Sequence, residues 1–361
     1  MKILYGVQAT GNGHITRARA MAPALKEADL EVDFLFSGRS RDKLFDMEPF
    51  GDFRSRDGLT FCTREGKIAL LPTIRKIKPA RFIREVRELD VSEYDLILTD
   101  FEPVTAWAGK LAGKQVVGLG HQYAFLHPIP QHRGNPLGRL VTRFFAPADV
   151  RLGLHWHHFD RAILPPIAPV EIIPTKIEED LYLVYLPFES LRAIEEMLKY
   201  FPQYRFAIFH PEASDRDDDN LMYRAPSRDG FQEVLAKAAG VIGNAGFGLA
   251  SEALQWGKKL LVKPLAGQPE QYSNALALEL LELAQAMEHL DRIALRHWLE
   301  YWRARQVRYP DVANAVAQWI AKGDFSDTQQ LATKLWQQSS CPDSGQFAEN
   351  LLGEWLYLPD F

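Results

Sequence analysis

Short apolar runs alternate with helical patterns along the whole sequence, and this alternation constrains the fold more than any other feature. Residues 2–7 form an apolar run that ends at a glycine-containing loop, and residues 15–25 repeat apolar side chains at helical spacing. Strands that alternate with helices build βαβ units, in which parallel strands are covered by helices on both faces. Further strands are expected at 32–37, 96–99, 115–119, 182–186, 204–209, 240–242 and 259–262, and further helices at 190–200 and 247–256.

A proline-rich stretch divides these elements into two sets. Residues 164–174 read LPPIAPVEIIP, and four prolines in eleven residues cannot lie within a helix or a central strand. A chain of 361 residues also exceeds what one hydrophobic core usually covers. We therefore expect an α/β fold of two doubly wound, Rossmann-like domains that face a cleft. The predicted parts are an N-terminal domain (1–165), a linker (166–178), a C-terminal domain (179–325) and a helical tail (326–361), for which packing back on the N-terminal domain is one option.

Composition places the chain among ordinary globular proteins. It is 47% hydrophobic and 25% charged, and no apolar run approaches the roughly 20 residues that span a bilayer. The N-terminus leads directly into a strand and a glycine loop, unlike a signal peptide. Cys62 and Cys341 lie far apart, without metal-ligand spacing. We expect a cytoplasmic protein without disulfides and, at a net charge of −5, without a nucleic-acid partner.

A glycine loop follows the first predicted strand and opens the first helix. Gly11 and Gly13 let the backbone turn tightly and leave helix N–H groups facing the predicted cleft. Thr16 stands where a dinucleotide fingerprint has its third glycine, so a Rossmann cofactor is only weakly indicated. His14 lies at the carboxyl end of a strand, where it could accept a proton from a substrate hydroxyl. The alternative for His14 is a local capping role.

Asp100 ends another predicted strand at the same edge of the sheet. A carboxylate bonded to one ring nitrogen would orient His14 and raise its basicity. His14 and Asp100 are therefore the predicted catalytic pair. The alternative for Asp100 is a cap of the turn that follows it.

A second glycine loop, at residues 243–248, follows the predicted strand at 240–242 and leads directly into a helix. Exposed helix N–H groups and the helix dipole favour a diphosphate there. Glu252 lies about one turn into the helix, where it could accept hydrogen bonds from ribose hydroxyls. Glu270 and Gln271 follow the next strand and offer acceptors and donors suited to sugar hydroxyls. Each alone would usually be a capping or solvated residue, so the indication comes from their order and spacing.

This passage resembles the donor-binding region of GT-B glycosyltransferases. It is similar to the UDP-glucuronosyltransferase group, to the lipid-II-forming N-acetylglucosaminyltransferase of peptidoglycan synthesis and to a bacterial and archaeal glycosyltransferase group. In the same families the acceptor-side loop carries a histidine that can serve as base, and Gly13 and His14 resemble this loop, with Asp100 matching the partner of the base. The residues that carry the donor-side resemblance are Gly246, Glu252, Pro264, Glu270, Gln271, Asn274 and Ala275.

The resemblance implies transfer of a hexosyl or N-acetylhexosaminyl group from a UDP- or dTDP-sugar to a hydroxyl of a glycan, a lipid-linked acceptor or a small molecule. Asn244 stands where the retaining branch has a glutamate, so the pattern favours inversion at the anomeric carbon, with no cofactor and no obligatory metal. A nucleotide-sugar epimerase and a non-catalytic nucleotide-sugar-binding protein are the alternatives. The implied donor residues are Gly243, Asn244, Gly246, Phe247, Gly248, Glu252, Glu270, Gln271 and Asn274, and the implied acceptor-side residues are Gly11, Gly13 and His121.

The remaining polar clusters give weaker indications. His121 follows a strand at the cleft edge, so it is a second candidate for the base or for acceptor contact. His155 and His157 would share a strand face, but two histidines without a third ligand make a weak zinc signal. We expect packing or acceptor contacts for them and for His158. The acidic run at 214–220 is expected to be a solvated loop rather than a cation site.

Residues 74–89 hold six basic side chains with apolar residues between them. One interpretation is peripheral contact with the inner membrane surface, as a lipid-linked acceptor would require. The alternative is a solvated surface helix, interrupted at Pro79.

Overall fold

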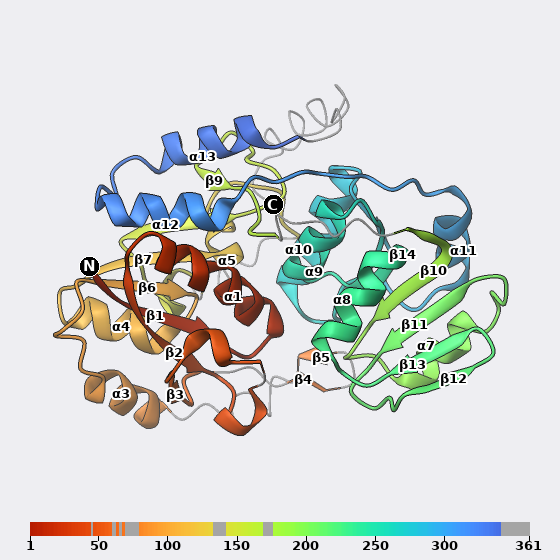
Figure 1. The fold of residues 1–361 in the computed structure, drawn as a ribbon, viewed down its shortest axis with the longest axis horizontal. Coiled ribbons are helices and arrows are strands. Elements are labelled where there is room, and N and C mark those ends of the chain that lie inside the picture. The colour runs from red at the N-terminus through yellow and green to blue at the C-terminus, as the bar shows by residue number, and fades with distance from the viewer. Residues whose placement is uncertain are drawn as a thin grey trace.

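The structure is a computed structural model that describes residues 1–44, 46–59, 79–132, 142–168 and 176–340, with the backbone of two short strands at 63–64 and 67–68. Two seven-stranded sheets lie side by side, one from each half of the chain (Figure 1). Helices surround both sheets, as the alternation in the sequence predicts. Within the described residues, no helix is long and apolar enough to cross a membrane.

The N-terminal sheet is parallel throughout, in the order β3-β2-β1-β6-β7-β8-β9. The order reverses between β1 and β6, which makes their carboxyl ends the switch point where open α/β sheets bind ligands. The strands are β1 (Lys2–Gln8), β2 (Glu31–Ser37), β3 (Arg54–Arg56), β6 (Leu96–Asp100), β7 (Gln115–Gly120), β8 (Val150–Leu154) and β9 (Ile163–Leu164), and β4 (Thr63–Arg64) and β5 (Lys67–Ile68) form a separate hairpin.

Helix α4 (Pro103–Leu111) begins where the local sequence supplies a start signal. Pro103 is the first residue of α4, and the buried Glu102 caps that helix by accepting hydrogen bonds from the N–H groups of Val104 and Thr105. Because Glu102 is the cap, the neighbouring Asp100 is free for another role. The helices are α1 (Asn12–Glu27), α3 (Pro79–Glu88), α4 (Pro103–Leu111) and α5 (His121–Ala124), with 3-10 turns η1 (Arg41–Lys43) and η2 (Glu48–Phe50).

Glycines let the short helix α5 lie directly on the sheet. A Cβ atom at Gly118 would stand 2.4 Å from the Tyr123 ring, and one at Gly153 would stand 2.8 Å from the backbone of Ala124. Side chains at these two positions would push α5 off β7 and β8. The close packing fixes His121 and Gln122, the first residues of α5, at the edge that faces the C-terminal half.

The C-terminal sheet also has seven strands, in the order β12-β13-β11-β10-β14-β15-β16. All its pairs are parallel except β12 with β13, and its order reverses between β10 and β14. The strands are β10 (Glu178–Tyr185), β11 (Arg205–Phe209), β12 (Arg216–Asp218), β13 (Leu221–Arg224), β14 (Ala238–Asn244), β15 (Lys259–Lys263) and β16 (Gln285–Ala286). The helices are α7 (Leu191–Leu198), α8 (Arg228–Lys237), α9 (Phe247–Gln255), α10 (Pro269–Leu280) and α11 (Arg292–Tyr301).

The chain then returns to the N-terminal half. Helix α12 (Val312–Lys322) packs against α1, and α13 (Thr328–Gln338) packs against β9 (Figure 1). The Trp336 indole of α13 donates to the carbonyl of Ile163 at 2.7 Å. The packing against the N-terminal half begins at α12, which precedes the helical tail expected from residue 326. Helix α12 packs there because it buries an apolar face that includes Val316 and Ile320.

The structure confirms the two doubly wound sheets and corrects several local predictions. The acidic run at 214–220 is not only loop, since β12 pairs with β13 there. His155 and His157 share no strand face, because β8 ends at Leu154. Pro79 is the first residue of α3, a position that suits its lack of a backbone donor. Residues 74–78 of the basic segment, 169–175 of the linker and 341–361 of the tail lie outside the described residues, so the linker boundaries stay a prediction.

Candidate functional site

The switch point of the N-terminal sheet brings the predicted catalytic pair together. His14 lies in the first turn of α1 and Asp100 is the last residue of β6, so both stand at the carboxyl edge. His14 Nδ1 lies 2.7 Å from Asp100 Oδ1, a hydrogen bond between groups 86 residues apart in the sequence. Asp100 is fully buried, whereas the His14 side chain keeps 15% of its exposure. The geometry leaves Nε2 as the ring nitrogen that can meet a substrate.

Arg17, one turn after His14 on α1, also binds Asp100. Its Nε donates to Oδ2 at 2.7 Å and its Nη2 donates to Oδ1 at 2.6 Å. Burial alone would raise the pKa of Asp100, but the charges of Arg17 and His14 outweigh it and leave that pKa below its ordinary value. The carboxylate is therefore ionised in its buried place. The sequence motifs described above do not include Arg17.

The amino ends of two helices from opposite halves meet next to this pair. Helix α9 has Gly246 at its N-cap, and no side chain within the described residues caps it. Helix α1 begins in the same way after Gly11. A Cβ atom built at Gly248 would stand 3.6 Å from Gly13 Cα, whereas one at Gly246, Gly11 or Gly13 would meet nothing within 4 Å. Uncapped N–H groups at a helix start form a binding place for an anion.

A buried carboxylate lies farther along α9. Glu252 is 8% exposed, and its Oε1 accepts a hydrogen bond from Gln232 of α8 at 2.8 Å. Burial is the main cause that raises the Glu252 pKa. Asn244, at the end of β14, donates from Nδ2 to the Lys263 carbonyl, and its buried Oδ1 has no hydrogen-bond partner among the described residues. Of these two residues of the predicted donor set, Asn244 thus lies at the carboxyl edge of the second sheet and Glu252 lies on the helix that follows it.

Comparison with known proteins identifies the family of the chain. A model of the family described as glycosyl transferase family 1 matches residues 1–302. The chain belongs to this family. No curated protein matches it.

Solved glycosyltransferases share the fold of this family 1 chain at low sequence identity. Phytolacca americana UGT2, complexed with UDP-2-fluoro-glucose and pterostilbene, has 12% identity and a TM-score of 0.56 over 98% of this chain and 99% of that one. LpCGTa, in complex with UDP, has 14% identity and a TM-score of 0.58 over 98% and 99%. Acinetobacter baumannii MurG has 15% identity and a TM-score of 0.50 over 99% of each chain. The GT-B fold and the family resemblance stated from the sequence are both confirmed.

Helix α10 of this glycosyltransferase touches the N-terminal half through two residues of the predicted donor set. Glu270 accepts hydrogen bonds from Gln122 Nε2 at 3.2 and 3.3 Å. Asn274 is fully buried and places its Oδ1 2.6 Å from His121 Nε2. Gln271 turns inward, where its Oε1 accepts from the Leu265 N–H at 2.8 Å. In this arrangement Glu270 is the member of the three that stays partly exposed at the junction.

The prediction of His121 as a second base is not supported by its surroundings. Its ring is buried and stacks on Phe247 of α9 at a centroid distance of 4.0 Å. Its Nδ1 lies 2.8 Å from the Leu154 carbonyl, and Nε2 faces Asn274. Both ring nitrogens thus lie against protein oxygens, and burial is the main cause that lowers the pKa of His121. Its place between the halves indicates a packing role, which the sequence could not show.

Other contacts at the junction carry no sequence signal of their own. The Trp156 indole donates to Ser251 Oγ of α9 at 3.0 Å, and its ring lies 4.9 Å from that of Phe247. His155 is buried in the same aromatic cluster, and the His157 and His158 rings stack on each other. These contacts agree with the packing role expected for the three histidines. Within the described residues, no group of three or more His, Cys, Asp or Glu side chains is arranged to hold a metal.

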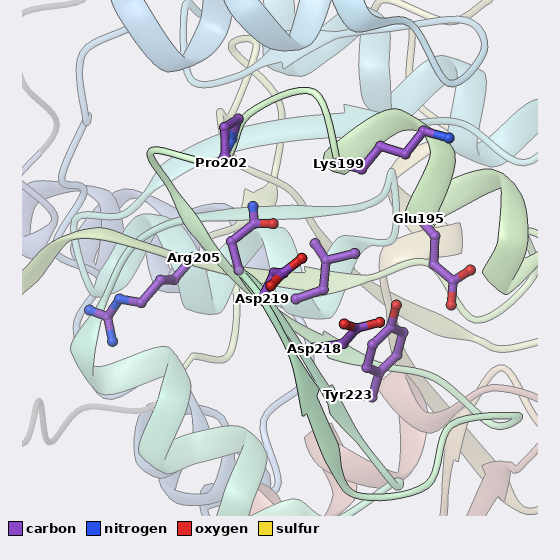
Figure 2. A pocket seen from close by; sticks show the side chains of 9 residues that line it. Glu195, Lys199, Pro202, Arg205, Asp218, Asp219 and Tyr223 are labelled. Atoms are coloured by element: carbon purple, nitrogen blue, oxygen red, sulfur yellow. The ribbon is translucent and has the colours of Figure 1, made fainter.

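A surface hollow of about 640 Å³ lies elsewhere, among the described residues of the C-terminal half (Figure 2). It includes Arg205 and Leu221, the first residues of β11 and β13, so it opens at the amino edge of the C-terminal sheet. Ligands of doubly wound folds bind at the opposite edge. Arg205 is moreover already paired with Asp180 and Glu178. We therefore place the candidate site at the switch points and not in this hollow.

Proposed function

We propose that this family 1 glycosyltransferase moves a sugar from a UDP- or dTDP-linked donor to a hydroxyl acceptor with inversion at the anomeric carbon. His14 Nε2 takes the proton of the acceptor hydroxyl while that oxygen forms its bond to the anomeric carbon. The bond from this carbon to the diphosphate breaks in the same step, and the diphosphate leaves with the electron pair. The amino end of α9 stabilises the charge that develops on it.

The observation that carries the proposal is the position of His14 and Asp100 beside the uncapped start of α9. A base and a diphosphate site must flank the reacting carbon from two sides, and the approach of Gly248 to Gly13 brings these two groups together. The donor-bound glycosyltransferases of the same fold support a nucleotide-sugar ligand, since two of them are solved with UDP or a UDP-sugar.

The decisive test is incubation of the purified protein with UDP- and dTDP-sugars and a panel of hydroxyl acceptors. We expect a glycoside of inverted anomeric configuration, detected by NMR, together with free nucleoside diphosphate. A retained configuration would refute the mechanism. Interconversion of donor sugars without acceptor would indicate the epimerase, and donor binding without turnover over the whole panel would indicate the non-catalytic alternative.

The same assay tests whether a metal is needed. Because helix N–H groups meet the diphosphate charge in the proposed site, we expect transfer to continue at its full rate in EDTA. Restoration of a lost activity by Mn²⁺ or Mg²⁺ would overturn this part of the proposal.

We also propose that this enzyme is cytoplasmic and makes peripheral contact with a membrane. Exposed basic side chains on helix α3 support this part of the proposal. Ile83, Arg84 and Arg87 are exposed on this helix, and neither arginine has an ion pair within the described residues. We expect sedimentation with vesicles containing anionic phosphatidylglycerol at low salt, and its loss in Arg84→Glu/Arg87→Glu. Replacement of the exposed Arg192 on α7 by Glu is the matched control and should leave sedimentation unchanged. Equal sedimentation of both variants, or none by the wild type, would contradict the proposal.

A further inference from the structure

A third charged side chain, Arg17, completes the buried cluster around His14 and Asp100. The guanidinium binds both oxygens of Asp100, and its Nη2 also lies 3.1 Å from His14 Nδ1. Residues three apart on a helix lie on the same side, so α1 places His14 and Arg17 together over the end of β6. Arg17, which is buried, therefore contacts both members of the catalytic pair.

Asp100 Oδ1 is shared between two donors. Arg17 Nη2 lies 2.6 Å from it and His14 Nδ1 lies 2.7 Å from it. A proton on Nδ1 that points to Oδ1 leaves the lone pair of Nε2 free. When Nε2 then takes a proton, the carboxylate and the guanidinium both lie close to the new imidazolium charge, at its Nδ1. The carboxylate stabilises this charge and the guanidinium opposes it.

We infer that Arg17 is a positioning residue of the base, which holds the Asp100 carboxylate ionised against His14 Nδ1 and offsets the negative charge that this carboxylate places beside the ring. The inference rests on the proposed function, in which His14 is the base. Burial alone would lower the pKa of Arg17, but Asp100 raises it above its ordinary value, so Arg17 is a permanent charge. A buried carboxylate with only a neutral imidazole beside it would instead tend to take up a proton.

The other titratable groups around the cluster do not replace Arg17. Burial raises the pKa of the Tyr5 and Tyr123 hydroxyls, which leaves both neutral. Burial lowers the pKa of His121, which favours its neutral form. Glu270 of α10 contributes a smaller part of the upward shift of the Arg17 pKa. Within the described residues, the charges in direct contact with the His14 ring are Arg17 and Asp100.

The test compares Arg17→Gln, which removes the charge, with Arg17→Lys, which keeps it but loses the two-pronged contact. The readout is the NMR titration of the His14 ring, assigned by its loss in His14→Gln. His14 and Asp100 titrate as a pair. Removal of the Arg17 charge therefore raises the pH midpoint of this titration, whether the proton is taken up by the imidazole or by the carboxylate. We expect an upward shift of about 1–2 pH units in Arg17→Gln, with the acid limb of kcat/KM moving likewise. Arg17→Lys should keep the wild-type midpoint and lose kcat.

An unchanged His14 midpoint in folded Arg17→Gln, or an equal shift in Arg17→Lys, would overturn the inference. If Arg17→Gln does not fold, Asp100→Asn is compared with the double variant Arg17→Gln/Asp100→Asn, which buries no lone carboxylate. The midpoint should be higher in the double variant, and equal midpoints would overturn the inference. The titration needs no turnover, so a protein without transferase activity would refute the proposed function while the effect of Arg17 on His14 stays measurable.

Discussion

Replacement of His14 by alanine is expected to lower kcat/KM for glycosyl transfer by about 10²- to 10⁴-fold, the usual contribution of a general base. Donor affinity, measured by calorimetry with the nucleotide sugar, should stay close to that of the wild type. The reason is geometric, since in the proposed mechanism His14 would meet the acceptor hydroxyl whereas α9 and Glu252 would bind the nucleotide part. His297→Ala is the matched control, because this exposed histidine lies on α11, far along the chain from the pair.

Two further measurements separate a missing base from a disturbed site. Added imidazole should restore part of the activity of His14→Ala, because a small base can enter the space that the ring leaves. Asp100→Asn should lower activity on its own but add little to His14→Ala, because Asp100 acts through the ring that is gone. Wild-type turnover in His14→Ala would show that the proton is taken elsewhere. Full additivity of the two changes would show that they act independently.

The sequence predicted the scaffold well because its signals are local. Apolar runs and glycine loops are set by neighbouring residues, so β1, α1, β14 and α9 lie where the patterns placed them. His14 and Asp100 could be placed at the same sheet edge for the same reason, as each follows a strand. Their 2.7 Å contact could not be predicted, because it depends on how the start of α1 lies against the end of β6, 86 positions away in the sequence.

The residues whose environment the sequence could not show are those whose surroundings come from distant segments. His121 looked available at the end of β7, yet β8 and α10 bring Leu154 and Asn274 against its two ring nitrogens. Arg17 looked like an ordinary helix cation, but the end of β6 turns it inward toward Asp100. A cation three residues after a candidate histidine on a helix is the one signal that could have identified it.

Replacement of Glu252 by glutamine is expected to weaken donor binding by about 10- to 100-fold, with little change in kcat. A hydrogen bond to a charged group contributes about 1.5–3 kcal/mol, and in the proposed site the nucleotide would make this bond equally in the ground state and in the transition state. Gln232 can donate a hydrogen bond to a glutamate or to a glutamine at position 252, so the substitution changes the charge with little change in shape. Glu233→Gln, next to Gln232 but exposed, is the matched control.

The chemical group that Glu252 binds can be identified with the same variant. If its carboxylate accepts from the ribose hydroxyls, a 2′,3′-dideoxy analogue of the nucleoside diphosphate should bind the wild type and Glu252→Gln equally, because it lacks those donors. Burial raises the Glu252 pKa, so its protonation begins at a higher pH than that of an exposed glutamate. Wild-type affinity for the donor should therefore fall as the pH drops, whereas that of Glu252→Gln should not. Loss of affinity for the dideoxy analogue in the variant would instead place Glu252 against the base or the diphosphate.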